Sequence, residues 1–107
     1  MPTDNESWLV EQGERVSGKN LAPWEDLVKA LWWADYAMRN GESLAAADAN
    51  CGFHANGLRA AKQLSLASSQ ELFTLDLDRF EQEYFDRFEA VCDEIRAAKT
   101  SRSVRST

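Results

Sequence analysis

The fold of this chain is decided by residues 69–98, which read SQELFTLDLDRFEQEYFDRFEAVCDEIRAA. Apolar side chains recur here every three or four residues, which is the period of an amphipathic α-helix. The apolar stripe consists of Phe73, Leu77, Phe80, Tyr84, Phe88, Val91 and Ile95. Ser68 and Glu71 have the spacing of a capping box, and polar residues follow Ala98. We therefore predict one long helix from about Ser69 to Lys99.

The opposite side of this predicted helix is acidic and holds Glu71, Asp78, Gln82, Asp86, Glu89 and Asp93. Residues 69–98 carry nine acids and three bases, residues 99–107 carry three bases and no acid, and the whole chain has a net charge of −6. An acidic helix repels nucleic-acid phosphate and anionic lipid. We therefore expect the folded body to bind neither nucleic acid nor a membrane directly.

Length and composition predict one small domain. The chain has 107 residues and is 44% hydrophobic, which is enough for a modest core. No apolar run approaches 18 residues and no cleavable leader is recognised, so a cytoplasmic protein is expected. We assign residues 1–98 to a helical domain and residues 99–107 to a basic flexible tail, because Lys, Arg, Ser and Thr cannot bury enough apolar surface to fold.

Two further helices are predicted in the first 41 residues. Asp4 can cap a first helix that includes Trp8 and Val16. Pro23 suits the first turn of a second helix, which runs to about Asn40 and ends at Gly41. The core stripe of this second helix consists of Trp24, Leu27, Val28, Leu31, Ala34 and Met38.

Residues 43–66 form an alanine-rich segment that begins with Ser43, a good N-cap. It has apolar residues on two sides, which favours a central helix packed on both sides. The dipeptides Cys51-Gly52 and Asn56-Gly57 could divide it, but we predict a continuous helix. No stretch alternates like a β-strand. The predicted fold is an all-α, single-domain bundle of about four helices with a long C-terminal helix.

No residue pattern predicts a catalytic, cofactor or metal site. His54 is the only histidine, and it shares a helix side with Asp48 and Cys51. A structural zinc site needs four ligands, and a Cys–His nucleophile needs a third, orienting group. We therefore expect no metal, no cofactor and no enzyme activity, with a Cys51-dependent enzyme as a third hypothesis. Cys51 and Cys92 are expected to be free thiols.

The aromatic cluster of Trp32, Trp33 and Tyr36 does not fit the core stripe of the second helix. Either the first helix covers these rings, or they form a protein-binding patch, because Trp and Tyr are enriched at interface hot spots. The acidic side of the last helix is likewise either a solvated surface or a second part of such a patch. The predicted partner-binding residues are Trp33, Tyr36, Asp78, Asp86, Glu89 and Asp93.

These features favour a small acidic protein-interaction module that regulates or inhibits a larger macromolecular partner. A nucleic-acid-binding protein or complex is one such partner, because a row of carboxylates can imitate a phosphate backbone and block a basic groove. Phage-encoded inhibitors, including many anti-CRISPR proteins, are similar in size and charge, without a match in sequence. The alternative is a structural homodimer with no foreign partner.

Overall fold

The computed structural model describes the backbone of residues 3–17 and 21–105, and the side chains of residues 3–17 and 21–98. Within these ranges the chain forms only α-helices and turns, and no strand, so the predicted all-α class is confirmed. The described residues form six helices, so the expected number of about four is wrong. They are α1 (Asp4–Arg15), α2 (Pro23–Arg39), α3 (Leu44–Cys51), α4 (Phe53–Leu64), α5 (Ala67–Thr74) and α6 (Leu77–Arg105).

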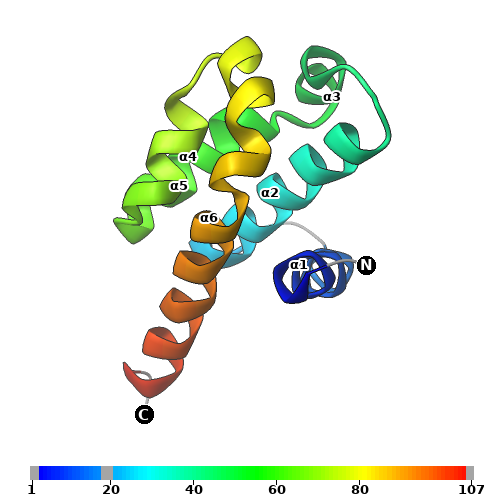
Figure 1. Cartoon of the computed structure of the whole chain (residues 1–107). Helices are drawn as coiled ribbons and strands as arrows, with labels where there is room; N and C mark the ends of the chain where they lie inside the picture. The colour runs from blue at the N-terminus through cyan, green and yellow to red at the C-terminus, as the bar shows by residue number, and fades with distance from the viewer. Residues whose placement is uncertain (1–2, 18–20, 106–107) are drawn as a thin grey trace.

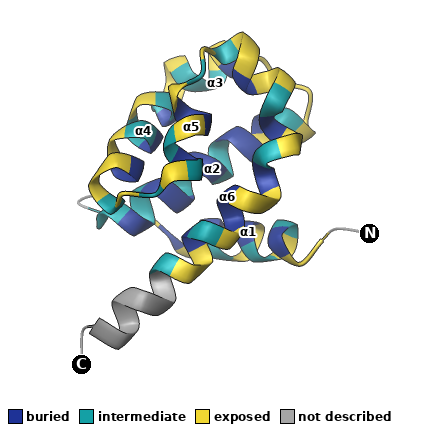
Figure 2. Cartoon of the chain, turned by 60° about the vertical axis from the view of Figure 1, so that its left-hand side comes forward, coloured by how far each residue is buried: buried dark blue, intermediate teal, exposed yellow. Residues whose placement is uncertain are grey.

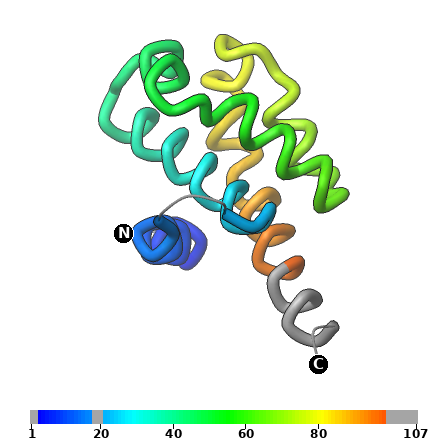
Figure 3. Tube along the Cα trace, turned by 180° about the vertical axis from the view of Figure 1, so that it is seen from behind, coloured from blue at the N-terminus to red at the C-terminus, as the bar shows by residue number. Residues whose placement is uncertain are grey.

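Helices α2 and α6 cross in the middle of the molecule (Figure 1). Helices α4 and α5 lie side by side on one flank, where α4 packs on α2 and α5 packs on α6. Helix α1 packs on α2 and α6 from the other flank, as the view from behind also shows (Figure 3). Because α1 stands apart from α4 and α5, it contributes to a surface that only α1, α2 and α6 share.

The core lies where the helices face one another (Figure 2). Leu31, Phe80, Tyr84, Phe88 and Val91, which the sequence predicts as core, are all between 0% and 2% exposed. The ring of Phe80 stacks on that of Tyr84 at a centroid distance of 5.7 Å. The two helices that cross in the middle therefore carry the predicted core residues.

The long helix predicted from Ser69 is in fact two helices, because the chain breaks between α5 and α6. Leu75 is extended, with φ −65° and ψ 144°, and ends α5. A new helix begins at Leu77, and Oδ1 of Asp76 accepts a hydrogen bond from the backbone N–H of Arg79 at 2.9 Å. This bond gives one of the free N–H groups of the first turn a partner. Asp76 is therefore the N-cap of α6, and α5 does not continue through it.

The predicted capping box at Ser68 is also wrong, because another carboxylate occupies the start of α5. The carboxylate of Glu94 on α6 accepts hydrogen bonds from the backbone N–H groups of Ser68 and Ser69, at 2.9 and 2.8 Å. An acidic side chain is favourable at a helix N-terminus. Glu94 therefore fastens the beginning of α5 to α6.

The continuous helix predicted for residues 43–66 is wrong as well. Gly52, with φ 68°, adopts the left-handed conformation and separates α3 from α4. The second weak point, Asn56-Gly57, stays helical within α4. Glycine at position 57 leaves room for the ring of Phe73, which a Cβ there would overlap. Ser43 caps α3 as predicted, with its hydroxyl accepting from Ala46 N–H at 3.2 Å.

The ends of the first two helices match the sequence closely. The N-cap of α1 is Thr3 and not Asp4, because Thr3 and Glu6 form a reciprocal capping box. Helix α2 runs from Pro23 to Arg39 and is followed by Gly41 at φ 69°, as predicted.

The predicted basic tail, residues 99–107, includes the last turns of α6, whose backbone is helical to Arg105. Residues 106–107 lie outside the described residues, and the flexibility of the tail stays a prediction. None of the described helices is both long and apolar enough to cross a membrane.

Candidate functional site

Three large apolar side chains are exposed among the described residues, and they come from three different helices. Val10 of α1 is 44% exposed, Tyr36 of α2 is 45% exposed and Phe85 of α6 is 52% exposed. All three lie near Arg39. Val10, Tyr36 and Arg39 line the same concavity, and the guanidinium carbon of Arg39 is 5.3 Å from the ring centroid of Phe85. We call Val10, Tyr36, Arg39 and Phe85 the Arg39 face.

Arg39 is held in place by two carboxylates. Its Nε donates to both carboxylate oxygens of Asp35, at 3.0 and 2.9 Å, and its Nη2 donates to Oε1 of Glu6 at 2.7 Å. The pKa of Glu6 is lowered by the backbone N–H of Thr3 and by the guanidinium of Arg39. Arg39 therefore joins α1 to α2, and its positive charge is already balanced within the protein.

Asp35 in turn connects the Arg39 face to the core. The carboxylate is 4% exposed and accepts a hydrogen bond from the Tyr84 hydroxyl at 2.8 Å. Burial, together with the nearby charge of Asp35, raises the pKa of Tyr84 well above its ordinary value. A buried carboxylate needs partners for both oxygens, and here a tyrosine and an arginine supply them. The position of Arg39 is thus fixed by a buried residue of α6.

Glu89 and Asp93, two of the predicted partner-binding residues, face α1. The amide of Asn5 donates to Glu89 Oε1 at 2.8 Å and to Asp93 Oδ1 at 3.0 Å. Arg96 completes the cluster by donating to the side-chain oxygen of Asn5 at 2.8 Å. These carboxylates therefore help to attach α1 to α6, and a role for them in binding a partner stays a prediction.

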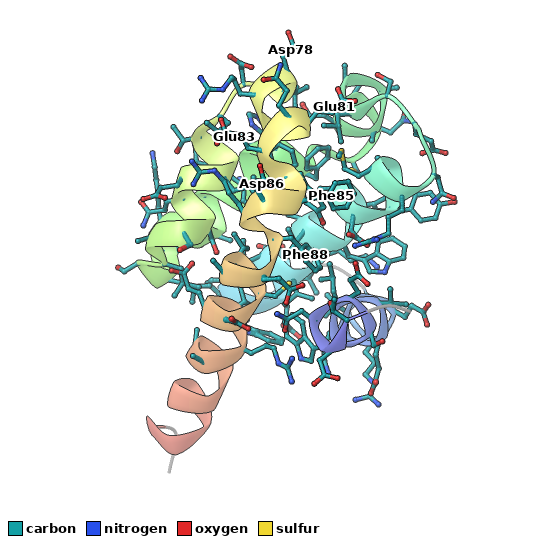
Figure 4. The ribbon with its side chains drawn as sticks, in the orientation of Figure 1. Asp78, Glu81, Glu83, Phe85, Asp86 and Phe88 are labelled. Atoms are coloured by element: carbon teal, nitrogen blue, oxygen red, sulfur yellow. The ribbon has the colours of Figure 1, made fainter. Side chains whose placement is uncertain are left out.

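The other two predicted carboxylates, Asp78 and Asp86, are exposed on α6 (Figure 4). Asp78 lies in the first turn of the helix, and Asp86 lies next to Phe85 in the sequence. Figure 4 also shows Glu83 and Phe85 leaving α6 on opposite flanks. Glu83 forms ion pairs with Arg79 and Arg87, which neutralises that flank. Glu81, which is exposed one helical turn before Phe85, leaves α6 on the same flank as Phe85 (Figure 4), so an acidic residue adjoins the Arg39 face there.

The aromatic cluster of α2 is partly covered by α1. The Trp32 ring lies directly on Gly13 of α1, where an added Cβ would overlap the ring. Lys29 Nζ lies 4.3 Å from the Trp32 ring centroid and donates to the Gly13 carbonyl at 2.8 Å. Trp32 and Trp33 are half-buried, whereas Tyr36 remains exposed. Of the two predicted aromatic binding residues, Tyr36 is therefore the more accessible.

Asp48, Cys51 and His54 are used for local hydrogen bonds. Asp48 Oδ1 accepts from the His54 backbone N–H at 3.0 Å, Cys51 Sγ donates to the Ala47 carbonyl at 3.1 Å, and His54 Nε2 lies 2.7 Å from the Leu75 carbonyl. No group of three potential metal-ligating side chains occurs in the described part of the chain. Cys51 and Cys92 are free, and burial raises the pKa of both thiols.

Sequence reasoning did not identify Val10, Arg39 or Phe85 as members of a functional surface. Phe85 carried a signal, because it is a large aromatic residue outside the apolar stripe of the last helix. Val10 and Arg39 carried none, since their proximity depends on how α1 docks on α2.

The chain matches no protein-family model, and no curated protein and no solved structure matches it. We therefore infer a function from the geometry of the Arg39 face.

Proposed function

We propose that this protein is a small binding module that docks on a basic surface of a larger protein and thereby regulates or inhibits it. The observation that carries the proposal is the Arg39 face, where Val10, Tyr36 and Phe85 are each about half exposed. Because each side chain is already about half buried, covering it contributes about half of the roughly 1.5–3 kcal/mol that full burial is worth. Exposed apolar residues that gather at one place are typical of protein-interaction sites.

The charge around this face indicates the chemistry of the partner. Glu11 and Glu14 on α1 and Asp86 on α6 are exposed, and the chain has a net charge of −6. A negative surface accelerates association with a positive one and disfavours partners of like charge. A nucleic-acid-binding protein has such a basic surface, and a module bound there would compete with nucleic acid. Acidic phage inhibitors such as many anti-CRISPR proteins act in this general way, which is an analogy of size and charge.

We also propose that the protein is not an enzyme. The Cys51 thiol, which is the candidate nucleophile, donates to a backbone carbonyl within its own helix. Burial raises its pKa, which disfavours the reactive thiolate. The ring of His54 is engaged with the Leu75 carbonyl. These contacts support structural roles for both residues.

The experiment is affinity capture from the native host with tagged wild-type protein and with a Tyr36→Ser/Phe85→Ser variant. Both side chains are about half exposed, so the variant should keep its helical circular dichroism. A Lys62→Ser/Gln63→Ser variant is the control, because both residues are exposed on α4, on the other side of the molecule from α1 (Figure 1).

We expect one protein to be captured by the wild type and the control but lost with the Tyr36→Ser/Phe85→Ser variant. Equal capture by all three forms would contradict the proposal. A wild-type protein that forms dimers, and loses them in the same variant, would favour the homodimer instead.

A further inference from the structure

The surface between α1 and α2 is hollowed next to Tyr36. Two adjoining concavities, of about 470 and 240 Å³, share Val10, Glu14 and Arg39 as lining residues. The larger continues along α1 past Glu11, and the smaller reaches Tyr36 and the half-buried Trp32. We call this hollow the α1–α2 groove. Its larger part has the size of a small-ligand site, for which about 300–1,000 Å³ is usual.

We infer that the α1–α2 groove binds a bulky apolar side chain of the partner that is flanked in sequence by Lys or Arg. This inference rests on the proposed function and adds the chemistry of the segment that is recognised. The groove supplies an apolar wall and an acidic rim.

The apolar wall is formed in advance of binding. It consists of Val10 and of the Trp32 and Tyr36 rings, which stack with centroids 5.7 Å apart and an interplanar angle of 25°. Trp32 is fixed by Gly13 beneath it and by Lys29 beside it. An apolar side chain that enters the groove therefore meets ordered rings, and little conformational entropy is lost on the protein side.

The rim of the groove selects positive charge. Glu11 and Glu14 are exposed, and Glu14 forms no ion pair with any described residue. Glu11 pairs with Arg15 at 2.8 Å, but both side chains are more than 60% exposed, so a Lys or Arg of the partner can replace Arg15 at small cost. Arg39, the cation of the groove, is already paired with Asp35 and Glu6 and offers little attraction to an anion.

This balance of charge also argues against a second copy of the chain as the occupant. Two copies that met through their Arg39 faces would bring Glu11 and Glu14 of each close to the acidic groups of the other. Like charges at an interface are unfavourable. A basic segment of a different protein is complementary to the same rim.

The test uses three synthetic tripeptides with blocked ends, Lys-Trp-Lys, Glu-Trp-Glu and Lys-Gly-Lys, titrated into isotope-labelled full-length protein and followed by backbone amide chemical shifts. Lys-Trp-Lys should shift the amides of Val10, Glu14 and Arg39. Loss of the apolar side chain in Lys-Gly-Lys should weaken binding by about tenfold or more. Reversal of charge in Glu-Trp-Glu should weaken it about threefold to tenfold.

Two variants locate the binding within the groove. Val10→Ser removes part of the apolar wall and should weaken Lys-Trp-Lys binding about threefold. Glu14→Gln removes one rim charge and should weaken it about twofold to threefold. Glu71→Gln removes the same charge from α5, where the Glu71 side chain is 65% exposed and lines neither concavity, and it should leave the affinity unchanged.

The inference is overturned if Lys-Gly-Lys or Glu-Trp-Glu binds as tightly as Lys-Trp-Lys, or if no peptide binds. It is also overturned if the shifts fall on another face, or if Glu71→Gln and Glu14→Gln have equal effects. Failure here, with capture of a partner still lost in the Tyr36→Ser/Phe85→Ser variant, would leave the proposed function standing. If the peptides bind the groove as expected but no captured partner is lost in that variant, the inference about the groove stands and the proposed function is rejected.

Discussion

At the scale of single residues, the hydrogen bond from Tyr84 to Asp35 connects the core to the exposed face. Tyr84→Phe should lower the free energy of unfolding by about 1–3 kcal/mol, because a buried carboxylate loses one of its partners. Urea unfolding followed by circular dichroism measures the change. Tyr36→Phe is the matched control, since Tyr36 is 45% exposed and its stability effect should stay within about 0.5 kcal/mol. Equal losses in the two variants would show that the Tyr84 hydroxyl has no special role.

Tyr84 also makes the free energy of unfolding depend on pH in the alkaline range. The folded protein keeps Tyr84 protonated because burial and Asp35 raise its pKa, whereas in the unfolded chain it ionises near its ordinary value of 10.0. The stability that this group contributes is therefore complete below pH 10 and falls as the pH rises above it. Tyr84→Phe should flatten this alkaline decline, and Tyr36→Phe should not.

Gly13 is a second residue whose identity matters, because the Trp32 side chain lies against it. A Cβ at position 13 would be 2.7 Å from the Cβ of Trp32 and would overlap its ring. Gly13→Ala should therefore cost about 1–3 kcal/mol through overpacking, more than the gain of at most about 1 kcal/mol from helix propensity. Thermal unfolding of Gly13→Ala, with and without Trp32→Ala, measures both terms, because alanine at position 32 removes the Cγ and Cδ1 atoms that the added Cβ would overlap most.

If the overlap is the cause, Gly13→Ala should cost clearly less when Trp32 is already alanine. Gly41→Ala serves as the control, because Gly41 has a positive φ of 69° and open space around it. Its cost of about 1–2 kcal/mol should be independent of Trp32. Additive effects of Gly13→Ala and Trp32→Ala would contradict the packing argument.

At the scale of helices, the apolar period predicts which residues are buried better than it predicts where a helix ends. Leu31, Tyr84 and Phe88 are core because the stripe that identifies them does not depend on helix boundaries. The break at Asp76 leaves the stripe intact on both sides, since Phe73 on α5 and Phe80 on α6 still pack together, with ring centroids 5.5 Å apart. A periodic pattern cannot report a break across which its side chains stay in contact.

The local signals of both breaks were present in the sequence. Gly52 allows a left-handed residue and Asp76 is a good N-cap, but the helical spacing of apolar residues continues across both positions. The attachment of α1 had no such signal. It depends on hydrogen bonds from Asn5 to Glu89 and Asp93, which are more than 80 residues away in the chain. The Arg39 face could not be predicted for the same reason.

The attachment of α1 should weaken in acid. The pKa of Glu6 is lowered in the folded protein by the Thr3 N–H and by Arg39, so its contribution to stability is complete above the ordinary carboxyl value of 4.5 and is lost as the pH falls through the lower folded value. Amide hydrogen exchange at about pH 3 and pH 6, corrected for intrinsic rates, should show α1 losing more protection than α4.

Glu6→Gln should lower the hydrogen-exchange protection of α1 already at neutral pH, because the ion pair with Arg39 is then absent at every pH. Glu11→Gln is the matched control, since Glu11 pairs with the exposed Arg15 and with no other described residue. A uniform loss of protection over α1 and α4 at low pH would mean that Glu6 does not determine how α1 is held.

At the scale of the whole molecule, the acidic charge and the exposed apolar residues lie together. Glu11 and Glu14 border the α1–α2 groove, and the exposed Glu81 leaves α6 on the same flank as Phe85. The chain therefore combines an apolar contact area with negative charge, which favours a basic partner.

Binding to a basic partner and pairing with a second copy should therefore respond to salt in opposite directions. If the Arg39 face binds a basic partner, added NaCl screens an attraction and the affinity falls. If it pairs with its own copy, salt screens a repulsion between carboxylates and the dimer becomes stronger. The Debye length shortens from about 10 Å at 0.1 M to about 3 Å at 1 M salt, which is enough to remove most of either effect.

We expect sedimentation at micromolar concentration to give a monomer in low salt, and the affinity for Lys-Trp-Lys or for a captured partner to fall about threefold or more between 0.1 and 1 M NaCl. Tyr36→Ser/Phe85→Ser should leave sedimentation unchanged. A dimer that strengthens with salt and is lost in that variant would assign the face to self-association, because the apolar contact would then be strong enough to outweigh the charge of −6 on each copy.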